Sequence, residues 1–216
     1  MKLKKFTFNY FSENTYVIYD ETKKCAILDP GCCNKEEESE LEEFIASAGL
    51  EPVLLLNTHC HIDHILGNSF VSEKYSLGLF IHKDDLPVLK AGTAVAGRYG
   101  IPYNESPLPT GYLEEGKGVE FGNTRLEVIH TPGHSPGSVC FINTSEKLVI
   151  GGDVLFRGSI GRTDLPGGDF NTLKRSIQEK VYLLPDEYTV YSGHGDETSI
   201  GQEKNTNPFV KARVTV

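Results

Sequence analysis

The strongest constraint on this chain is a histidine-rich stretch directly after an apolar run. Residues 52–57 read Pro-Val-Leu-Leu-Leu-Asn and predict a buried strand, and Thr-His-Cys-His-Ile-Asp-His follows. Side chains two positions apart on an extended chain point the same way, so His59 and His61 can meet at one point. Asp63 and His64 follow where we expect a turn into a helix, and they face a second point beside the first. Because one ion needs only about three protein ligands, four in so short a stretch predict two ions.

Three further ligand-type side chains also follow strand-like runs. Glycines lie beside each of them, and glycine permits the tight turns and the close backbone approach that a site at a strand end requires. Because open α/β sheets gather their chemistry at the carboxyl ends of strands, we expect these side chains to join the histidine-rich stretch. They are His134 after residues 124–129, Asp153 after residues 147–150, and His194 after residues 188–191.

Composition limits what the protein binds and where it works. The chain of 216 residues has 21 Lys and Arg against 30 Asp and Glu, a net charge of −9, so we expect no nucleic-acid partner. No apolar run reaches the roughly 18 residues of a membrane span, so we expect no membrane association. The start lacks the apolar segment of a signal peptide, and five cysteines, an odd number, fit free thiols in a cytoplasmic protein. No oligomeric state is predicted.

The pattern of elements predicts one domain, residues 1–216. Strand-like runs come in two groups, each followed by helical patterns, which favours an α/β fold with two sheets packed face to face and helices outside. We therefore expect an αββα four-layer sandwich, with helices at 35–48, 64–75, about 84–98 and 170–184, a turn at 12–14 and a long loop at 100–118.

Together the quoted segments resemble the metallo-β-lactamase superfamily, whose H-x-H-x-D-H motif precedes a later His, Asp and His in the same order. The resemblance spans most of the chain and implies the αββα fold. It also implies two divalent ions, with zinc favoured and iron or manganese as alternatives, since His and Asp ligands suit all three metals. The implied ligands are His59, His61 and His134 for one ion, Asp63, His64 and His194 for the other, and Asp153 between them.

Such a centre predicts hydrolysis. Two divalent ions bring four positive charges, and Asp63, Asp153 and a bound hydroxide remove three, which leaves the centre at roughly +1. It would supply hydroxide near neutral pH and stabilise the oxyanion formed from an ester, thioester, lactone or amide. Asp63 and Asp153 are the predicted catalytic residues, with Asp63 also a candidate proton acceptor.

The segment Ser-Ile-Gly-Arg-Thr-Asp, residues 159–164, resembles the glyoxalase II-like branch, especially its short bacterial form. That branch hydrolyses S-lactoylglutathione and related thioesters, which implies a small-molecule thioester substrate. Arg162 matches a basic residue that contacts glutathione there; the alternative is a structural salt bridge to Asp164 or Asp169. Thr163 departs from the aromatic residue typical of the branch, so recognition of glutathione stays open.

Two other functions are open. Gly-Arg-Thr-Asp also resembles the persulfide dioxygenase branch, whose single iron would be held by His59, His134 and Asp153. A metal-stabilised module without catalytic activity is the third hypothesis. The complete second ligand set favours the binuclear hydrolase over both.

Several residues near the predicted centre have two interpretations. Asp29 is either a turn residue or an acceptor for a ligand imidazole. His82 is expected to cap a helix or lie at the surface. His130 is expected to orient its turn through hydrogen bonds, and Cys60 to point away from the ligands into the core.

Overall fold

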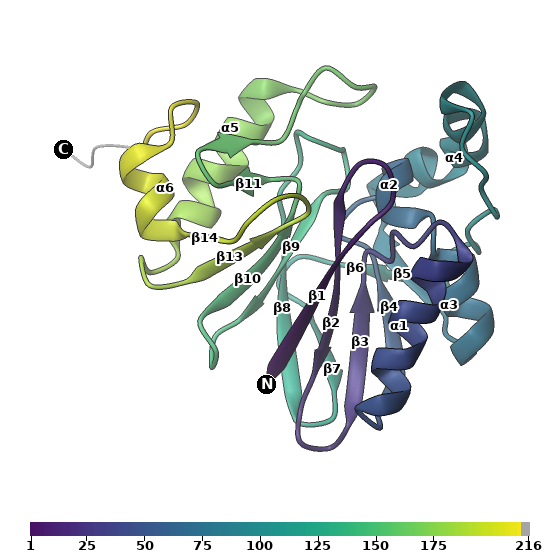
Figure 1. Ribbon diagram of the computed structural model, residues 1–216. Coiled ribbons are helices and arrows are strands. Elements are labelled where there is room, and N and C mark those ends of the chain that lie inside the picture. The colour runs from purple at the N-terminus through teal and green to yellow at the C-terminus, as the bar shows by residue number, and fades with distance from the viewer. Residues whose placement is uncertain (213–216) are drawn as a thin grey trace.

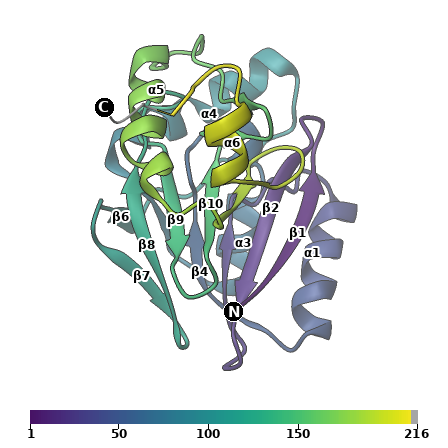
Figure 2. The ribbon, with the colours of Figure 1, turned by 90° about the vertical axis from the view of Figure 1, so that its left-hand side faces the viewer.

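The computed structural model describes residues 1–212, and its two large sheets pack face to face. Figure 1 shows the sheets in the middle, with α1 and α3 on one side and α5 and α6 on the other. In Figure 2, α5 and α6 lie in front of the strands. The predicted αββα sandwich is confirmed.

The first sheet is formed by the N-terminal part of the chain, in the order β1-β2-β3-β4-β5-β6. Strands β1, β2 and β3 pair antiparallel, and β3 to β6 pair parallel. The parallel strands therefore end at one common edge. The strands are β1 Lys2–Phe8, β2 Glu13–Tyr19, β3 Lys24–Leu28, β4 Glu51–Leu56, β5 Leu79–His82 and β6 Gly111–Leu113.

The second sheet has the order β14-β13-β10-β9-β8-β7. Its one parallel pair is β10 with β13, which brings two strand ends together at one edge. Its strands are β7 Gly118–Phe121, β8 Thr124–His130, β9 Val139–Asn143, β10 Leu148–Gly152, β13 Thr189–Ser192 and β14 Thr198–Ser199. A separate short hairpin joins β11 Leu155–Phe156 to β12 Ser159–Ile160.

Helices cover the outer faces of both sheets and one end of the sandwich. The α-helices are α1 Lys35–Ser47, α2 Ile62–Ile65, α3 Asn68–Tyr75, α4 Leu86–Tyr99, α5 Phe170–Glu179 and α6 Ile200–Thr206, and the 3-10 helices are η1 Lys83–Asp85 and η2 Val181–Leu183. Within residues 1–212, none of the helices combines the length and the apolar character that crossing a membrane requires.

Alternation along the strands builds three hydrophobic layers. On β2, Val17 packs with Leu41 of α1, whereas its neighbour Ile18 packs with Phe141 of the second sheet. The third layer lies under α5, where Leu173 is fully buried. Because successive side chains on a strand point to opposite faces, apolar residues at consecutive positions require cover on both sides of the sheet. Burying one such side chain contributes about 1.5–3 kcal/mol.

The predicted helix at 64–75 is wrong, because the chain forms two helices there. The interruption lies at Gly67, whose backbone N–H donates to the carbonyl of Pro30 at 2.7 Å. A side chain at this position would meet the Sγ of Cys32 at 2.4 Å. The close approach of the segment before α1 therefore requires glycine and breaks the helical run.

The predicted loop at 100–118 and the predicted turn at 12–14 also need correction. Residues 111–113 form β6, which pairs with β5 at the edge of the first sheet and has too few apolar residues to stand out in sequence. The turn between β1 and β2 lies earlier, with left-handed backbone at Asn9 and Ser12. Glu13 already belongs to β2.

Asp20 joins the two sheets away from the ligand-bearing edge. Its buried carboxylate accepts hydrogen bonds from the backbone N–H of Thr22 at 2.9 Å and of Asn123 at 2.7 Å, and from the hydroxyl of Thr124 at 2.9 Å. Burial alone would raise the pKa of Asp20, but these hydrogen bonds lower it to about 2.

We expect Asp20→Ala to lower the free energy of unfolding by about 2 kcal/mol at neutral pH, because buried donors lose their acceptor. The folded-state pKa lies below the unfolded value of about 4, so this contribution is present above about pH 4 and is lost as the pH falls toward 2. Urea unfolding at several pH values measures it. Glu21→Ala, at an exposed neighbour, should change stability by less than about 0.5 kcal/mol, and an equal effect of both variants would contradict the assignment.

Candidate metal centre

The predicted ligands lie where strands of both sheets end. His59 and His61 follow β4, and Asp63 and His64 lie on α2, which begins at Ile62, two residues before the predicted start. The remaining three follow β8, β10 and β13 of the second sheet: His134, Asp153 and His194. All seven side chains converge at this shared edge.

Three imidazoles form the first group. The Nδ1 atom of His61 lies 2.8 Å from the Nε2 atom of His134, which lies 3.2 Å from the Nε2 atom of His59. Their rings meet edge to face, so the nitrogen atoms turn toward one point. This is the arrangement in which three imidazoles can hold one metal ion.

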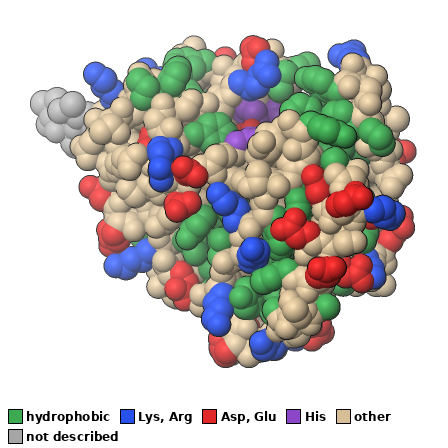
Figure 3. Space-filling model, viewed as in Figure 1, with side chains coloured by type: hydrophobic (Ala, Val, Ile, Leu, Met, Phe, Trp, Pro, Cys, Tyr) green, Lys and Arg blue, Asp and Glu red, His purple; other side chains and the backbone are tan. Residues whose placement is uncertain are grey.

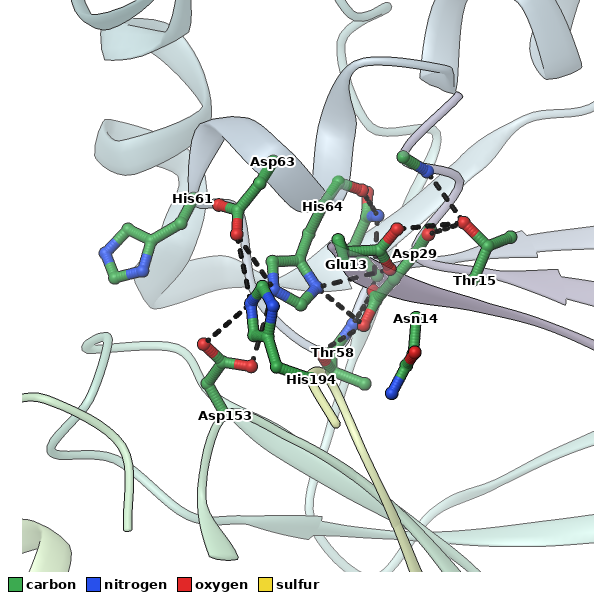
Figure 4. A network of polar contacts seen from close by, with 12 residues as sticks. Glu13, Asn14, Thr15, Asp29, Thr58, His61, Asp63, His64, Asp153 and His194 are labelled. Carbon is green, nitrogen blue, oxygen red and sulfur yellow. Dashed lines mark hydrogen bonds and ion pairs between the residues drawn. The ribbon is translucent and has the colours of Figure 1, made fainter. Parts of the chain in front are cut away.

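The second group consists of Asp63, His64 and His194, whose side chains converge in Figure 4. The Oδ2 atom of Asp63 lies 3.1 Å from the Nε2 atom of His194 and 3.6 Å from the Nε2 atom of His64. One carboxylate and two imidazoles again converge on a point.

Asp153 contacts both groups. Its Oδ2 atom lies 3.5 Å from the Nε2 atom of His134 and 3.5 Å from that of His194, and its Oδ1 atom lies 3.4 Å from the Nε2 atom of His64. Gly193 makes this approach possible, because a side chain there would meet the Oδ1 atom of Asp153 at 2.1 Å. The carboxylate therefore lies between the two triads.

Outer hydrogen bonds set which imidazole nitrogen faces the centre. The Nδ1 atom of His134 pairs with the backbone carbonyl of Arg162 at 2.8 Å, and that of His194 with the carbonyl of Phe11 at 3.1 Å. A ring that donates from Nδ1 to a carbonyl presents an unprotonated Nε2 in its neutral form. That tautomer is the one a metal ion needs.

His64 is held by Asp29, which resolves the two interpretations of that carboxylate. Asp29 lies 3.2 Å from the Nδ1 atom of His64 and accepts hydrogen bonds at 2.6 Å from both the backbone N–H and the hydroxyl of Thr58 (Figure 4). A second buried carboxylate, Glu13, lies 3.8 Å from the same Nδ1 atom. Asp29 therefore orients one ligand and fixes the start of the histidine-rich loop.

Two buried atoms without hydrogen-bond partners indicate whether metal ions fit the centre. The Nε2 atom of His64 and the Oδ1 atom of Asp153 make no hydrogen bond with any described residue, although both are shielded from solvent. Buried polar atoms are normally paired. A cation at each triad would pair them, and the donor set of imidazole and carboxylate suits zinc, iron and manganese. The residues present therefore fit a pair of divalent ions.

Without metal, the first and second triads differ in charge. Burial and the neighbouring imidazoles lower the pKa of His59 well below its usual value and that of His61 to about 3, so both are neutral. Burial alone would lower the pKa of His194, but hydrogen bonds to Asp153 and Asp63 raise it to about 10. Metal binding on that side must displace a proton, so metal affinity should rise with pH.

A buried carboxylate that sequence reasoning missed links the two ligand loops. Asp85 accepts hydrogen bonds at 2.6 Å from the backbone N–H groups of Cys60 and Gly137, and a third from the hydroxyl of Ser135. It lies at the N-cap of α4 but makes no capping bond to that helix. Its one detectable feature in sequence is that it follows a strand, as the ligands do.

A second missed group connects the N-terminal strands to the loop of His194. The side-chain amide of Asn14 donates to the backbone carbonyls of Ser192 at 3.0 Å and Gly195 at 2.8 Å, and the hydroxyl of Tyr16 donates to that of Ser192 at 2.6 Å. Nothing in the local sequence pattern distinguishes these two residues from other polar groups of a strand.

The histidines outside the seven ligands behave as predicted. His82 caps η1 by accepting from the backbone N–H of Asp84 at 3.3 Å, and the Nε2 atom of His130 pairs with the carbonyl of Pro136 at 2.9 Å. Their rings stack nearly parallel, 4.0 Å apart. Cys60 is buried, as expected.

Arg162 lies at the rim of a pocket above the centre rather than at its floor. The pocket has a volume of about 1000 Å³, and His61, Asp63 and Asp153 are among the residues that line it. The Arg162 side chain is exposed and pairs with both carboxylate oxygens of Asp164, at 2.7 and 2.8 Å. The salt bridge that the sequence left as an alternative is therefore present, while the guanidinium still borders the pocket.

Comparison with known proteins bears on the same residues. The model of the metallo-beta-lactamase superfamily matches residues 9–194, a range that includes all seven predicted ligands. The chain belongs to this superfamily. Within the metallo-β-lactamase superfamily, it is 36% identical to hydroxyacylglutathione hydrolase GloC of Haemophilus influenzae, over 94% of this chain and 95% of the relative. It is 37% identical to the probable metallo-hydrolase YqgX of Bacillus subtilis, over 97% of this chain and 98% of the relative.

Solved structures of similar fold agree with this assignment to the metallo-β-lactamase superfamily. BLEG-1 B3 metallo-beta-lactamase has a TM-score of 0.89 at 36% identity, covering 97% of this chain and 99% of its own. TTHA1623, solved in a di-iron-bound form, has a TM-score of 0.86 at 37% identity, covering 96% of this chain and 100% of its own. The family and its metallo-hydrolase relatives support a metal-dependent hydrolase.

Proposed function

We propose that the protein is a binuclear metal-dependent hydrolase of acyl thioesters. The observation that carries the proposal is the pair of ligand triads joined by Asp153 at the floor of the pocket. One ion would be held by His59, His61 and His134, and the other by Asp63, His64 and His194. The relative named hydroxyacylglutathione hydrolase supports a thioester substrate of the S-lactoylglutathione type.

The reaction adds water to the thioester carbonyl and breaks the carbon–sulfur bond, which gives a carboxylate, a thiol and a proton. Bound metal ions lower the pKa of water to about 7 and so supply a nucleophile at neutral pH. Asp63 borders the pocket 3.1 Å from His194 and is placed to take up the released proton. Asp153 holds the two triads in register, and Arg162 lies at the rim where an anionic substrate group would enter.

The metals and the substrate are tested together. We expect purified protein to contain about two metal ions per chain, with zinc favoured, and to hydrolyse S-lactoylglutathione. Removal by a chelator should abolish turnover, and re-addition should restore it. Elemental analysis that finds two ions without thioesterase activity would reject the substrate class.

The same measurement separates the hydrolase from an oxidoreductase. The second triad favours two ions over the single iron, held by His59, His134 and Asp153, of a persulfide dioxygenase. One iron per chain, with oxygen uptake on glutathione persulfide, would establish the dioxygenase instead. Because one relative was solved in a di-iron-bound form, two irons with thioesterase activity would still support the hydrolase.

A further inference from the structure

One wall of the pocket is an apolar stripe along α4. Pro87, Val88, Ala91 and Val95 recur at helical spacing and line the pocket. The other side of the helix packs into the core through residues such as Leu89, which is buried. α4 therefore has two apolar sides, and only one of them is fully covered by the protein.

Stability explains only part of this stripe, because Val88 and Val95 pack against the core on one side and remain open to the pocket on the other. Pro87 and Ala91 are exposed, and Val88 and Val95 are only half-buried. Apolar surface in a concave site gains free energy when a ligand removes it from water. The polar peptide of glutathione would gain little from such a wall, whereas a hydrocarbon chain would gain from every buried methylene.

The length of the wall exceeds what a small acyl group needs. The stripe begins at Pro87, and Tyr99 continues it at the end of α4. At 1.5 Å per residue this distance is about 18 Å along the helix axis. An acetyl or lactoyl group at the metal centre would leave most of the wall in contact with water.

Two arginines lie at the rim. Arg98, in the last turn of α4, lines the pocket and makes no ion pair with any described residue, whereas Arg162 is paired with Asp164. Arg162 lies near enough to the phenol of Tyr99 to interact with it electrostatically, and the Tyr99 ring meets that of Phe11 edge to face at 5.6 Å. The end of α4 therefore faces Arg162 across the mouth of the pocket.

The surface shows the same arrangement. In Figure 3 histidine side chains are visible at the base of a hollow, with hydrophobic side chains on both sides and a basic side chain next to an acidic one above. The chain as a whole is acidic, with a net charge of −9, and Asp84 also lines the pocket. Because Arg162 is paired with Asp164, Arg98 supplies the unpaired positive charge that favours an anionic group at the rim.

We propose that the substrate is a thioester with an extended apolar acyl chain, which lies along α4, and with an anionic group on its thiol portion, which lies between Arg98 and Arg162. The proposal rests on the proposed thioesterase function and names its substrate class. The carbonyl would lie at the floor of the pocket, beside the ligand triads, and water would release a fatty carboxylate and an anionic thiol.

Chain length is the first test. We expect kcat/KM of the metal-loaded protein to rise from acetyl through butyryl and hexanoyl to octanoyl thioesters of β-mercaptopropionate, by about fifteenfold per step where both added methylenes are buried. Thioesters of N-acetylcysteamine, a neutral thiol, should show the same dependence on chain length but a higher KM, by about threefold. A flat or falling series would overturn the apolar assignment.

Matched variants locate the two contacts. Val95→Thr keeps the shape and adds a hydroxyl, so it should reduce the gain per step, whereas Ala94→Ser adds a hydroxyl outside the pocket and should leave the series unchanged. Arg98→Gln should remove the preference for the anionic thiol and its salt dependence, whereas Lys90→Gln, which removes a charge outside the pocket, should retain both. If Val95→Thr and Ala94→Ser give the same chain-length series, the acyl chain does not lie against Val95. If Arg98→Gln and Lys90→Gln give the same preference for the anionic thiol, Arg98 does not bind the anionic group.

Binding measurements test the substrate assignment separately from the proposed hydrolysis. Calorimetry with non-hydrolysable S-alkyl thioethers of β-mercaptopropionate measures affinity without turnover. Tighter binding with each longer chain, weakened by Val95→Thr, supports the pocket assignment even where no thioester is hydrolysed, an outcome that would reject only the proposed reaction. Hydrolysis of acetyl thioesters without any gain in affinity from chain length would leave the reaction established and reject the apolar substrate.

Discussion

Replacing Asp153 by Asn is expected to lower kcat/KM for thioester hydrolysis by about a thousandfold, equivalent to about 4 kcal/mol. The variant should also retain no more than one metal ion per chain. The reason is geometric, because this carboxylate contacts both triads: one oxygen lies 3.4 Å from His64, and the other lies 3.5 Å from both His134 and His194. An amide loses the charge and keeps only one acceptor oxygen, because its other terminal group is an NH2 donor. Elemental analysis and steady-state kinetics on the same preparation measure both effects.

Asp186→Asn provides the matched control, because Asp186 is exposed and pairs with Lys204 away from the pocket. It should keep both ions and full activity. Circular dichroism of Asp153→Asn should show an intact fold, since the αββα core does not depend on this residue. Two tightly held ions with near-normal turnover in Asp153→Asn would show that the carboxylate does not lie between them.

The second large effect is expected at Asp85, which touches none of the ligand side chains. Asp85→Ala leaves three buried donors without their acceptor, on Cys60, Ser135 and Gly137, and should lower the free energy of unfolding by about 3–5 kcal/mol. These donors belong to the loops of His59, His61 and His134. We therefore expect metal to dissociate from the first triad at least about tenfold faster, as measured by chelator competition.

Two companion variants distinguish positioning from general loss of stability. Asp85→Asn keeps the shape and one acceptor oxygen, so it should be intermediate in both stability and metal release. Asp84→Ala, at the exposed neighbouring position, should change stability by less than about 0.5 kcal/mol. Normal metal release from a destabilised Asp85→Ala protein would show that Asp85 stabilises the fold without positioning the ligands.

The sequence predicted that the candidate ligands would lie together, and for the first four of them the reason is local spacing. His59 and His61 lie two positions apart after β4, so their side chains point the same way along extended chain. Asp63 and His64 follow on α2. The αββα layers also followed from the sequence, because strand-like runs come in two groups, each followed by helical patterns.

Features that depend on long-range contacts were not predictable. The role of Asp85 requires two loops that lie far apart in sequence, and the break between α2 and α3 depends on Gly67 passing Pro30. β6 is recognisable only through its pairing with β5. The apolar stripe on α4 is visible in the sequence, but only the fold shows that one side of it faces an open pocket.

The hydrogen bonds from Asn14 and Tyr16 to the loop of His194 affect the order in which the metal centre assembles. Strand β2 anchors the loop of this candidate ligand through Ser192, which lies 178 residues further along the chain than Asn14, so the second triad cannot form until β13 has docked. We therefore expect metal to bind the second triad only after that docking step. A cation bound there would link two segments that are far apart in sequence.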